Sequence, residues 1–270
     1  MLTCMSIGFN GRLGNQLFQI ASTIGAARFN NFEVFFPAEN FYVDVESPHS
    51  YKGCKVTEAF NFNSGLLLPA NEIMNSIRFS FREGDNFKYN SDIEKIPDGT
   101  DLFGYFQNER YFNHCEDEIL DLFSFRKEIT DFSDLNYPLL NDSVSLHVRR
   151  GDYLNSPEHH PTQDISYYSD ALEVIDSKNV YVFSDDIKWC ENNLNMDGYN
   201  WNYVDVENPY VSMHIMSKCD NNIICNSSFS WWGAWLNKSD NKKVVAPSNW
   251  FGPAIKKDAS EVYGKNWIVI

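Results

Sequence analysis

The feature that most constrains the fold is an alternation, from residue 143 onward, of short apolar runs with stretches of helical periodicity. Three runs have the length and apolar content of buried strands. They are VSLHV, VYVF and NIIC, centred near residues 146, 182 and 224. Further elements are expected around them: helices over 167–176, 186–194, 209–218 and 228–236, and a fourth strand in KKVVAP at 242–247. Such alternation is typical of a parallel sheet with right-handed crossovers, so we predict an α/β fold.

The amino-terminal half is less regular, and residues 38–100 show only short apolar clusters. The elements expected elsewhere in this half are strands at 2–9, 32–36 and 101–106 and helices at 15–29 and 109–123. The polar stretch from Asp131 to Asp142 contains Pro138 and has the composition of a linker. We therefore predict two halves, residues 1–135 and 136–270.

Charge narrows the range of functions. The chain has 37 acidic and 22 basic residues and a formal net charge of −15. Such a chain repels polyphosphate, which disfavours a nucleic-acid-binding function. Because basic residues are scarce, a pair of adjacent arginines is informative about a site for a small anion.

The cysteines and the amino-terminal residues indicate in which cellular compartment the protein is expected. None of the six cysteines forms a C-x-x-C pair and most lie in apolar runs, which predicts buried free thiols rather than disulfides or zinc ligands. The first residues lack the basic and apolar regions of a signal peptide, and no window approaches the ~18 apolar residues of a membrane span. We predict a soluble, cytoplasmic protein and leave open a peripheral association with the inner membrane face. The N-x-S sequences at Asn141, Asn226 and Asn237 are then chance matches.

Charged and polar side chains follow three of the predicted strands. In chain order these are Arg149, Arg150 and Asp152; Asp185 and Asp186; and Asn226, Ser227, Ser228 and Phe229. Ligands of open parallel sheets bind beyond the carboxyl ends of the strands, so the three groups predict one site.

The residue types fit a nucleoside diphosphate bound without a metal ion. Adjacent guanidinium groups match phosphate oxygens. Serine hydroxyls at a helix start add donors beside free backbone N–H groups that favour an anion. A carboxylate can accept both N–H donors along the N1 and N2 edge of guanine. No Asp, Glu or His cluster at metal-ligand spacing accompanies them in the sequence.

Each of these groups also has an ordinary structural interpretation. The arginine pair could form ion pairs at a surface turn, and the two aspartates could be a helix N-cap and a first-turn acid. His147 lies inside an apolar strand, where a core histidine is as plausible as a ligand contact. Three tryptophans at helical spacing favour packing over sugar stacking: Trp231, Trp232 and Trp235.

A glycine-containing loop, G-R-L-G-N-Q, links the first predicted strand to the first helix. It lacks the Lys-Ser/Thr of a P-loop and the spacing of a dinucleotide fingerprint. Gly11 and Gly14 would let the backbone around Arg12 approach a ligand closely. We interpret the loop as a second wall that faces the diphosphate across a cleft.

Four motifs, in this order, resemble those of the α-1,2-fucosyltransferases, GDP-fucose-dependent enzymes of glycosyltransferase family 11. They are GRLGNQLFQIA at 11–21, HVRRGDY at 147–153, VFSDD at 182–186 followed by Trp189, and CNSSFSWWGAWL at 225–236. The second and fourth are long and specific, the first is moderately so, and the third is weak alone. The region 38–125 matches nothing that we can name, and acceptor choice is expected to reside there.

The resemblance implies a GT-B-like architecture, in which two Rossmann-like halves face each other across a cleft. Residues 136–270 would bind the GDP-sugar and residues 1–135 would form the acceptor side. The donor would be GDP-fucose and the acceptor a galactose-terminated oligosaccharide or glycan. L-fucose would be transferred with inversion to form an α-1,2 linkage, and no metal or other cofactor would be required.

The resemblance also implies roles for single residues. Arg149 or Arg150 would hold the β-phosphate and stabilise the leaving group, and Asp152 is a candidate general base by its position. The other implied donor contacts are His147 and Asp185 or Asp186 with guanosine; Asn226, Ser227, Ser228 and Phe229 around the diphosphate and nucleoside; and Gly11, Arg12 and Gly14 in the glycine loop. Gly14 and Asn15 would line the reaction centre, with Asn15 among the catalytic residues.

Three alternatives remain open at this point. The donor could be another GDP-deoxysugar. The chain could also be a non-catalytic carbohydrate-binding domain, since 16% of its residues are aromatic. Finally, it could be an interaction protein whose arginines only pair with acids, which predicts no nucleotide binding.

Overall fold

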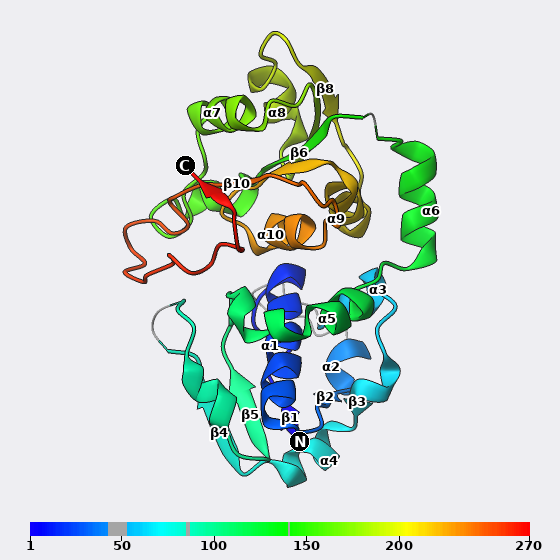
Figure 1. The fold of residues 1–270 in the computed structure, drawn as a ribbon, viewed down its shortest axis with the longest axis vertical. Coiled ribbons are helices and arrows are strands. Elements are labelled where there is room, and N and C mark those ends of the chain that lie inside the picture. The colour runs from blue at the N-terminus through cyan, green and yellow to red at the C-terminus, as the bar shows by residue number, and fades with distance from the viewer. Residues whose placement is uncertain (43–52, 85–86, 140) are drawn as a thin grey trace. The chain divides into compact units, whose positions relative to one another are not determined.

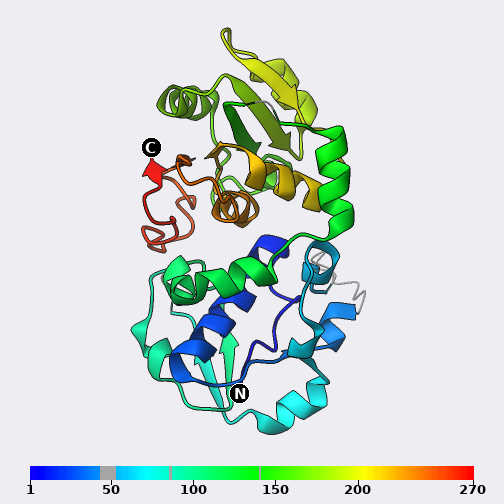
Figure 2. The same ribbon diagram turned by 45° about the vertical axis from the view of Figure 1, so that its right-hand side comes forward.

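The computed structural model describes residues 1–42, 53–84, 87–139 and 141–270. The chain forms two compact units (Figures 1 and 2). The first unit holds Met1–Arg126 and Asp258–Tyr263, and the second holds Lys127–Lys257 and Gly264–Ile270. The boundary that the sequence placed after residue 135 lies inside helix α6, Lys127–Asn136.

The second unit is built on a six-stranded parallel sheet with the order β11-β10-β9-β6-β7-β8. Its strands are β6 (Ser143–Val148), β7 (Asn179–Ser184), β8 (Asn200–Tyr203), β9 (Asn221–Ile223), β10 (Val244–Ala246) and β11 (Ile268–Val269). Every residue of β6 is buried, as expected of a central strand in a parallel sheet. The predicted parallel α/β arrangement is confirmed for this unit.

Helices cover both faces of this sheet, with α7 and α8 on one side and α9 and α10 on the other (Figure 1). They are α7 (Ile165–Ile175), α8 (Ile187–Asn193), α9 (Pro209–Lys218) and α10 (Ser228–Trp235), and a 3₁₀ turn, η5, spans Gly151–Asn155. All four α-helices begin within two residues of their predicted starts. Trp231 and Trp232 are fully buried in α10, which confirms that they pack in the core.

The linker predicted from Asp131 to Asp142 is wrong in its first half, because residues up to Asn136 belong to α6. The helix buries Ile129 and Ser133. The Ser133 hydroxyl pairs with the Nδ1 atom of His214 on α9. The narrow apolar face explains why the polar composition of this stretch concealed a helix.

The first unit has a three-stranded parallel sheet of order β1-β5-β4 and a two-stranded parallel ribbon, β2 and β3. The strands are β1 (Leu2–Thr3), β2 (Phe36–Pro37), β3 (Leu67–Leu68), β4 (Phe79–Arg82) and β5 (Thr100–Phe103). The helices are α1 (Leu13–Asn30), α2 (Glu39–Tyr42), α3 (Val56–Ala59), α4 (Ala70–Ser76) and α5 (Glu116–Leu122), with the 3₁₀ turns η1 (Ser64–Leu66), η2 (Ser91–Lys95), η3 (Glu109–Tyr111) and η4 (Asn113–Cys115).

Three predictions for this unit need correction. The strand expected over 2–9 ends at Thr3, because the chain turns from residue 5 and Gly8 adopts φ 82°. The strand expected over 32–36 is reduced to β2 and a single bridge between Val34 and Leu2. The helix expected over 109–123 is split into η3, η4 and α5.

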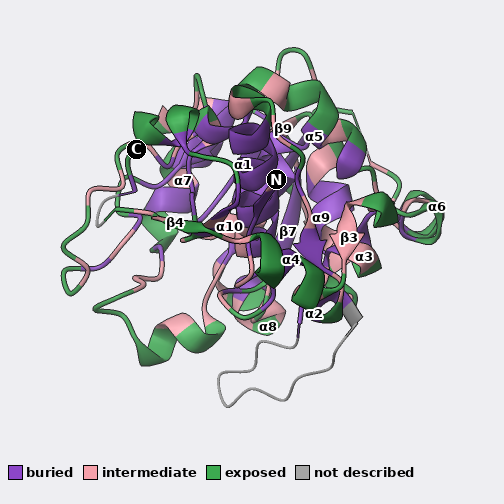
Figure 3. Cartoon of the chain, turned by 90° about the horizontal axis from the view of Figure 1, so that it is seen from below, coloured by how far each residue is buried: buried purple, intermediate pink, exposed green. Residues whose placement is uncertain are grey.

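Helix α1 forms the centre of the first unit, and nearly all of its residues are buried (Figure 3). A Cβ atom on Gly25 would lie 1.9 Å from the Tyr111 carbonyl oxygen, so only glycine permits this close packing of the helix.

All six cysteines are free thiols, and five of them are buried, as the sequence predicted. Within the described residues, no helix has the length and apolar character that crossing a membrane requires.

Candidate active site

The three polar groups predicted from the sequence lie at one edge of the second sheet. Strand β6 lies between β9 and β7, and all three strands are parallel. Their carboxyl ends therefore meet at the same edge, where the arginine pair, the aspartate pair and the start of α10 follow them. The structure brings these groups together.

Arg149 is held by two carboxylates. Its Nη1 atom lies 2.9 Å from Asp185 Oδ2, and its Nη2 atom donates to Asp152 Oδ1 at 2.5 Å. Burial acts to lower the pKa of this guanidinium, but Asp185 and Asp152 outweigh it and the pKa is raised. Arg149 is therefore a fixed positive charge whose two terminal nitrogens both face carboxylates.

Arg150 is held differently. Its Nε atom donates to Asp186 Oδ2 at 3.1 Å, and its guanidinium carbon lies 3.9 Å from the centroid of the Trp189 ring. Its backbone N–H donates to Asp185 Oδ1 at 2.9 Å. The side chain is thus stacked on one side and hydrogen-bonded at its inner end.

Asp186 makes two kinds of contact, one of which was predicted from the sequence. It is the N-cap of α8, where its Oδ1 atom accepts the backbone N–H of Trp189 at 3.2 Å. The N-cap interpretation is confirmed, and the same carboxylate also binds Arg150. Sequence reasoning assigned Trp189 no role of its own, although its position in the first turn after an N-cap aspartate was a usable signal.

Gly151 allows the aspartate pair to approach the loop that follows β6. A Cβ atom at this position would lie 2.5 Å from Asp185 Oδ2, closer than ordinary contact allows. A side chain at this position would force the Asp185 carboxylate to move. The constraint is one of space and not of a positive φ, because the φ of Gly151 lies outside the left-handed region.

His147 is buried in β6 and faces the start of α10. Its Nδ1 atom lies 3.2 Å from Cys225 Sγ, and its ring centroid lies 5.8 Å from that of Phe229. Burial, with a smaller effect of Arg149, lowers the pKa of His147 to about 3, and burial raises the pKa of Cys225 to about 12. Both groups are neutral near pH 7, so they are not an activated thiolate–imidazolium pair of the kind used in cysteine catalysis.

Helix α10 begins at the same edge. Ser227 is its N-cap and accepts the backbone N–H of Phe229 at 3.3 Å, and Ser228 is its first residue. The Tyr153 hydroxyl donates to the carbonyl oxygen of Asn226 at 3.0 Å and so ties the loop after β6 to the start of α10.

The side chain of Asn226 is engaged by the protein itself. Its Nδ2 atom donates to the carbonyl oxygens of Pro161 at 3.0 Å and Trp250 at 3.2 Å, and its Oδ1 atom accepts from Gln163 at 3.1 Å. We therefore assign this amide to holding the surrounding loops. These partners could not be predicted from the sequence, because they are distant from Asn226 along the chain.

The predicted glycine loop lies in the first unit. Gly11 has φ 85°, and a Cβ atom on it would lie 2.3 Å from Asn15 Nδ2. Arg12 is the N-cap of α1, and Gly14 is buried in its first turn. The Oδ1 atom of Asn15 accepts from Gln107 Nε2 at 2.7 Å. These residues form one cluster, and its role as a second wall of the site stays a prediction.

Among the described residues, no three His, Cys, Asp or Glu side chains gather in a way that could hold a metal ion. The charged groups of the site are instead two arginines and three aspartates.

Comparison with known proteins places the chain in a family. The family model described as glycosyl transferase family 11 matches residues 70–270. The chain belongs to this family. The match includes the whole arginine and aspartate site and confirms the resemblance found in the motifs.

Several relatives of this family 11 glycosyltransferase are known. The O-antigen biosynthesis glycosyltransferase WbnK of Escherichia coli is 38% identical over 172 residues, which cover 58% of this chain and 57% of that protein. The chain thus aligns with little more than half the length of WbnK. An alpha-1,2-colitosyltransferase of Escherichia coli is 28% identical and covers 89% of this chain and 90% of its own length. The mouse galactoside 2-alpha-L-fucosyltransferase Sec1 is 24% identical over 98% of this chain and 73% of its own length.

Solved structures share the fold at low identity. POFUT1 in its apo form covers 91% of this chain and 96% of its own, with a TM-score of 0.52 and 13% identity. The fucosyltransferase NodZ from Bradyrhizobium covers 86% of this chain and 91% of its own, with a TM-score of 0.53 and 14% identity. The fold is therefore α/β and GT-B-like, as predicted.

Proposed function

We propose that this glycosyltransferase transfers L-fucose from GDP-fucose to the 2-hydroxyl of a terminal galactoside, with inversion and without a metal ion. The observation that supports this most directly is the convergence of Arg149, Arg150 and the start of α10 at one sheet edge. Relatives that include a galactoside 2-alpha-L-fucosyltransferase support the choice of transferred sugar, linkage and acceptor.

The charge that develops during the reaction explains why these groups suit it. As the bond between fucose and GDP breaks, negative charge grows on the diphosphate. Guanidinium groups already fixed by Asp185, Asp186 and Trp189 need little reorganisation to stabilise that charge. The free N–H groups and dipole of α10 would add to this effect.

The proton of the acceptor hydroxyl must also be removed. Asp152 is our candidate base, because its carboxylate lies beside Arg149 and its side chain is 53% exposed. The second unit would hold the donor and the first unit the acceptor.

The decisive experiment incubates the protein with GDP-fucose and a panel of galactosides in buffer with EDTA, followed by linkage analysis of the product. We expect an α-1,2-fucosylated galactoside. Replacing Arg149 or Arg150 by Ala should lower turnover by roughly 100-fold or more, the cost of losing one oxyanion donor. Arg28→Ala is the matched control, because Arg28 pairs with Glu118 in the first unit. If both site variants retain turnover within about threefold of the wild type, the mechanism is wrong.

A second donor has support from a relative over most of the chain. This relative is named an alpha-1,2-colitosyltransferase, so its name gives the same α-1,2 linkage with colitose as the transferred sugar. Colitose is a deoxysugar, so parallel assays with GDP-fucose and GDP-colitose separate the two proposals. A non-catalytic carbohydrate-binding domain, by contrast, would consume neither donor and would show no affinity for GDP.

A further inference from the structure

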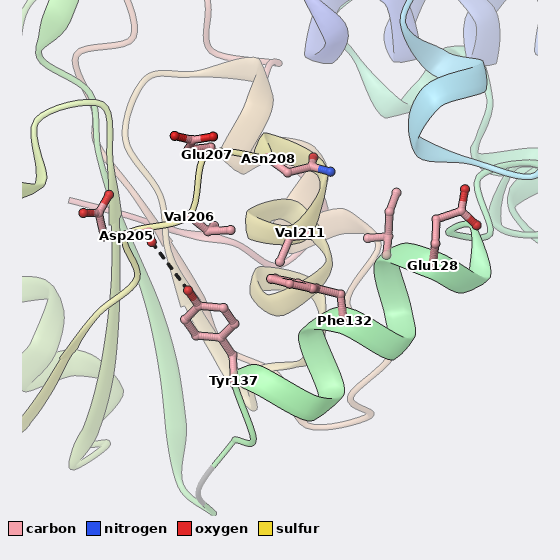
Figure 4. A pocket seen from close by; sticks show the side chains of 9 residues that line it. Glu128, Phe132, Tyr137, Asp205, Val206, Glu207, Asn208 and Val211 are labelled. Atoms are coloured by element: carbon pink, nitrogen blue, oxygen red, sulfur yellow. Dashed lines mark hydrogen bonds between the residues drawn. The ribbon is translucent and has the colours of Figure 1, made fainter.

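The second unit has an open groove of about 530 Å³ that the proposed reaction does not use. It lies between α6 and the segment that connects β8 to α9 (Figure 4). Its volume lies in the range of ligand and side-chain pockets. All nine residues that line it belong to the second unit.

The floor of the groove is apolar. Phe132 extends from α6, Tyr137 is the residue that follows this helix, and Val206 and Val211 lie opposite them (Figure 4). The Phe132 side chain is 47% exposed, and Leu135, one turn further along α6, is 81% exposed. Large apolar residues that lie together on a surface indicate a contact with another molecule.

The rim of the groove is acidic. Its lining includes Glu128, Asp205 and Glu207 but no Lys or Arg. The carboxylates of Asp205 and Glu207 form no hydrogen bond or ion pair with any described residue. By contrast, two acids of α6 pair with lysines: Asp131 with Lys127, and Asp134 with Lys218. Among the described residues, the charges of Asp205 and Glu207 are thus left unbalanced.

This combination selects one kind of occupant. A second copy of the chain would bring another formal charge of −15 and a second acidic rim, which disfavours self-association. An anionic membrane or a nucleic acid would be repelled for the same reason. A segment that carries both basic and apolar side chains matches the rim and the floor together.

We propose that this groove docks a basic, amphipathic segment of a partner protein. An apolar side chain of the partner packs against Phe132, and Lys or Arg side chains face Asp205 and Glu207. The proposal does not rest on the proposed transferase function, because the groove lies outside the arginine and aspartate site.

The test uses a fluorescent peptide of Lys and Leu at helical spacing, and a twin with Glu in place of Lys, titrated with the whole protein at physiological salt. Asp205→Asn combined with Glu207→Gln should weaken binding of the basic peptide by roughly tenfold, the effect of two screened charge pairs. Phe132→Ser should weaken it by a similar factor, because it removes the apolar contact. The acidic twin should not bind.

The matched control removes two charges elsewhere. Asp170 and Glu173 are exposed acids on α7, so Asp170→Asn combined with Glu173→Gln removes the same number of negative charges without touching the groove. The proposal is overturned if this control weakens binding as much as the groove variant, or if Phe132→Ser has no effect. It is also overturned if lactose displaces the peptide, which assigns the groove to a saccharide, or if sedimentation shows a dimer that Phe132→Ser dissociates. Circular dichroism of each variant confirms that the fold is retained.

Discussion

Gly151 leaves no room for a side chain beside Asp185, and this gives a sharp test of the candidate site. Substitution by Ala removes no charge and no hydrogen-bonding group. It places a methyl carbon 2.5 Å from Asp185 Oδ2 and 3.2 Å from its Cγ atom. Non-bonded heavy atoms prefer a separation of about 3.5 Å, so the carboxylate must move by roughly 1 Å.

The cost of that movement follows from the contacts that Asp185 makes. One oxygen lies 2.9 Å from Arg149 Nη1, and the other accepts the Arg150 N–H at 2.9 Å. A hydrogen bond to a charged group contributes about 1.5–3 kcal/mol, and the carboxylate cannot keep both contacts after the shift. On the proposed function this lost preorganisation weakens GDP binding by roughly 10- to 100-fold.

Calorimetric titration with GDP in EDTA measures the effect. Gly84→Ala is the control, because a Cβ atom there would meet nothing within 4 Å. Asp185→Ala should weaken binding as well, and adding Gly151→Ala to it should cost little more, because the atoms that collide are gone. If Gly151→Ala binds GDP within about twofold of the wild type, the carboxylate does not position the arginines and the reasoning fails.

Three further predictions concern the same edge of the sheet. Burial lowers the pKa of His147 from its ordinary 6.5 to about 3. Between these two pH values the unfolded chain binds a proton that the folded protein does not, so the free energy of unfolding decreases as the pH falls. Chemical denaturation measures the free energy of unfolding at pH 7 and at pH 5. The decrease between the two should be about 2 kcal/mol smaller in His147→Gln than in the wild type, and equal decreases would contradict this. Ser227→Ala removes the N-cap of α10 and should lower the free energy of unfolding by about 1 kcal/mol in the same assay, whereas Ser228→Ala should have a smaller effect. Asp152→Asn weakens the contact with Arg149 Nη2 and removes a negative charge, so GDP should bind more tightly while turnover falls. Unchanged turnover would exclude Asp152 as the base.

In the second unit, sequence reasoning located strands whose central residues are buried. β7 contains the continuous apolar run VYVF, and β6 contains VSLHV, whose three apolar residues are all buried, because helices cover both sides of the sheet. β8 was missed because it is an edge strand with the sequence NWNY, in which exposed or half-buried asparagines interrupt the apolar pattern. Periodicity detects burial, so it fails where one edge of a strand faces solvent.

The first unit was harder to predict because its contacts are long-range. Leu2 of β1 pairs with Thr100 of β5, and nothing in either segment specifies the other. Residues 4–9 are apolar enough for a strand, yet Cys4 and Ile7 are buried through turns instead. In the site, residue types predicted the arginine and aspartate groups, whereas the stacking of Trp189 on Arg150 required the geometry of a helix start.

A strongly acidic chain needs short-range hydrogen-bond donors, and not a favourable net charge, to bind a diphosphate at this site. Two arginines and three aspartates leave the cluster with one net negative charge, so its overall field does not attract an anion. Binding must rest on short-range donors, and both terminal nitrogens of Arg149 already face carboxylates. The side chain of Asp152 is 53% exposed and that of Asp185 only 24%. Asp152 is therefore the carboxylate that water can solvate once its ion pair with Arg149 is broken. Exchange of Asp152 for a phosphate would keep Arg149 fixed by Asp185 and would release a carboxylate beside the donor, where the reaction needs a base.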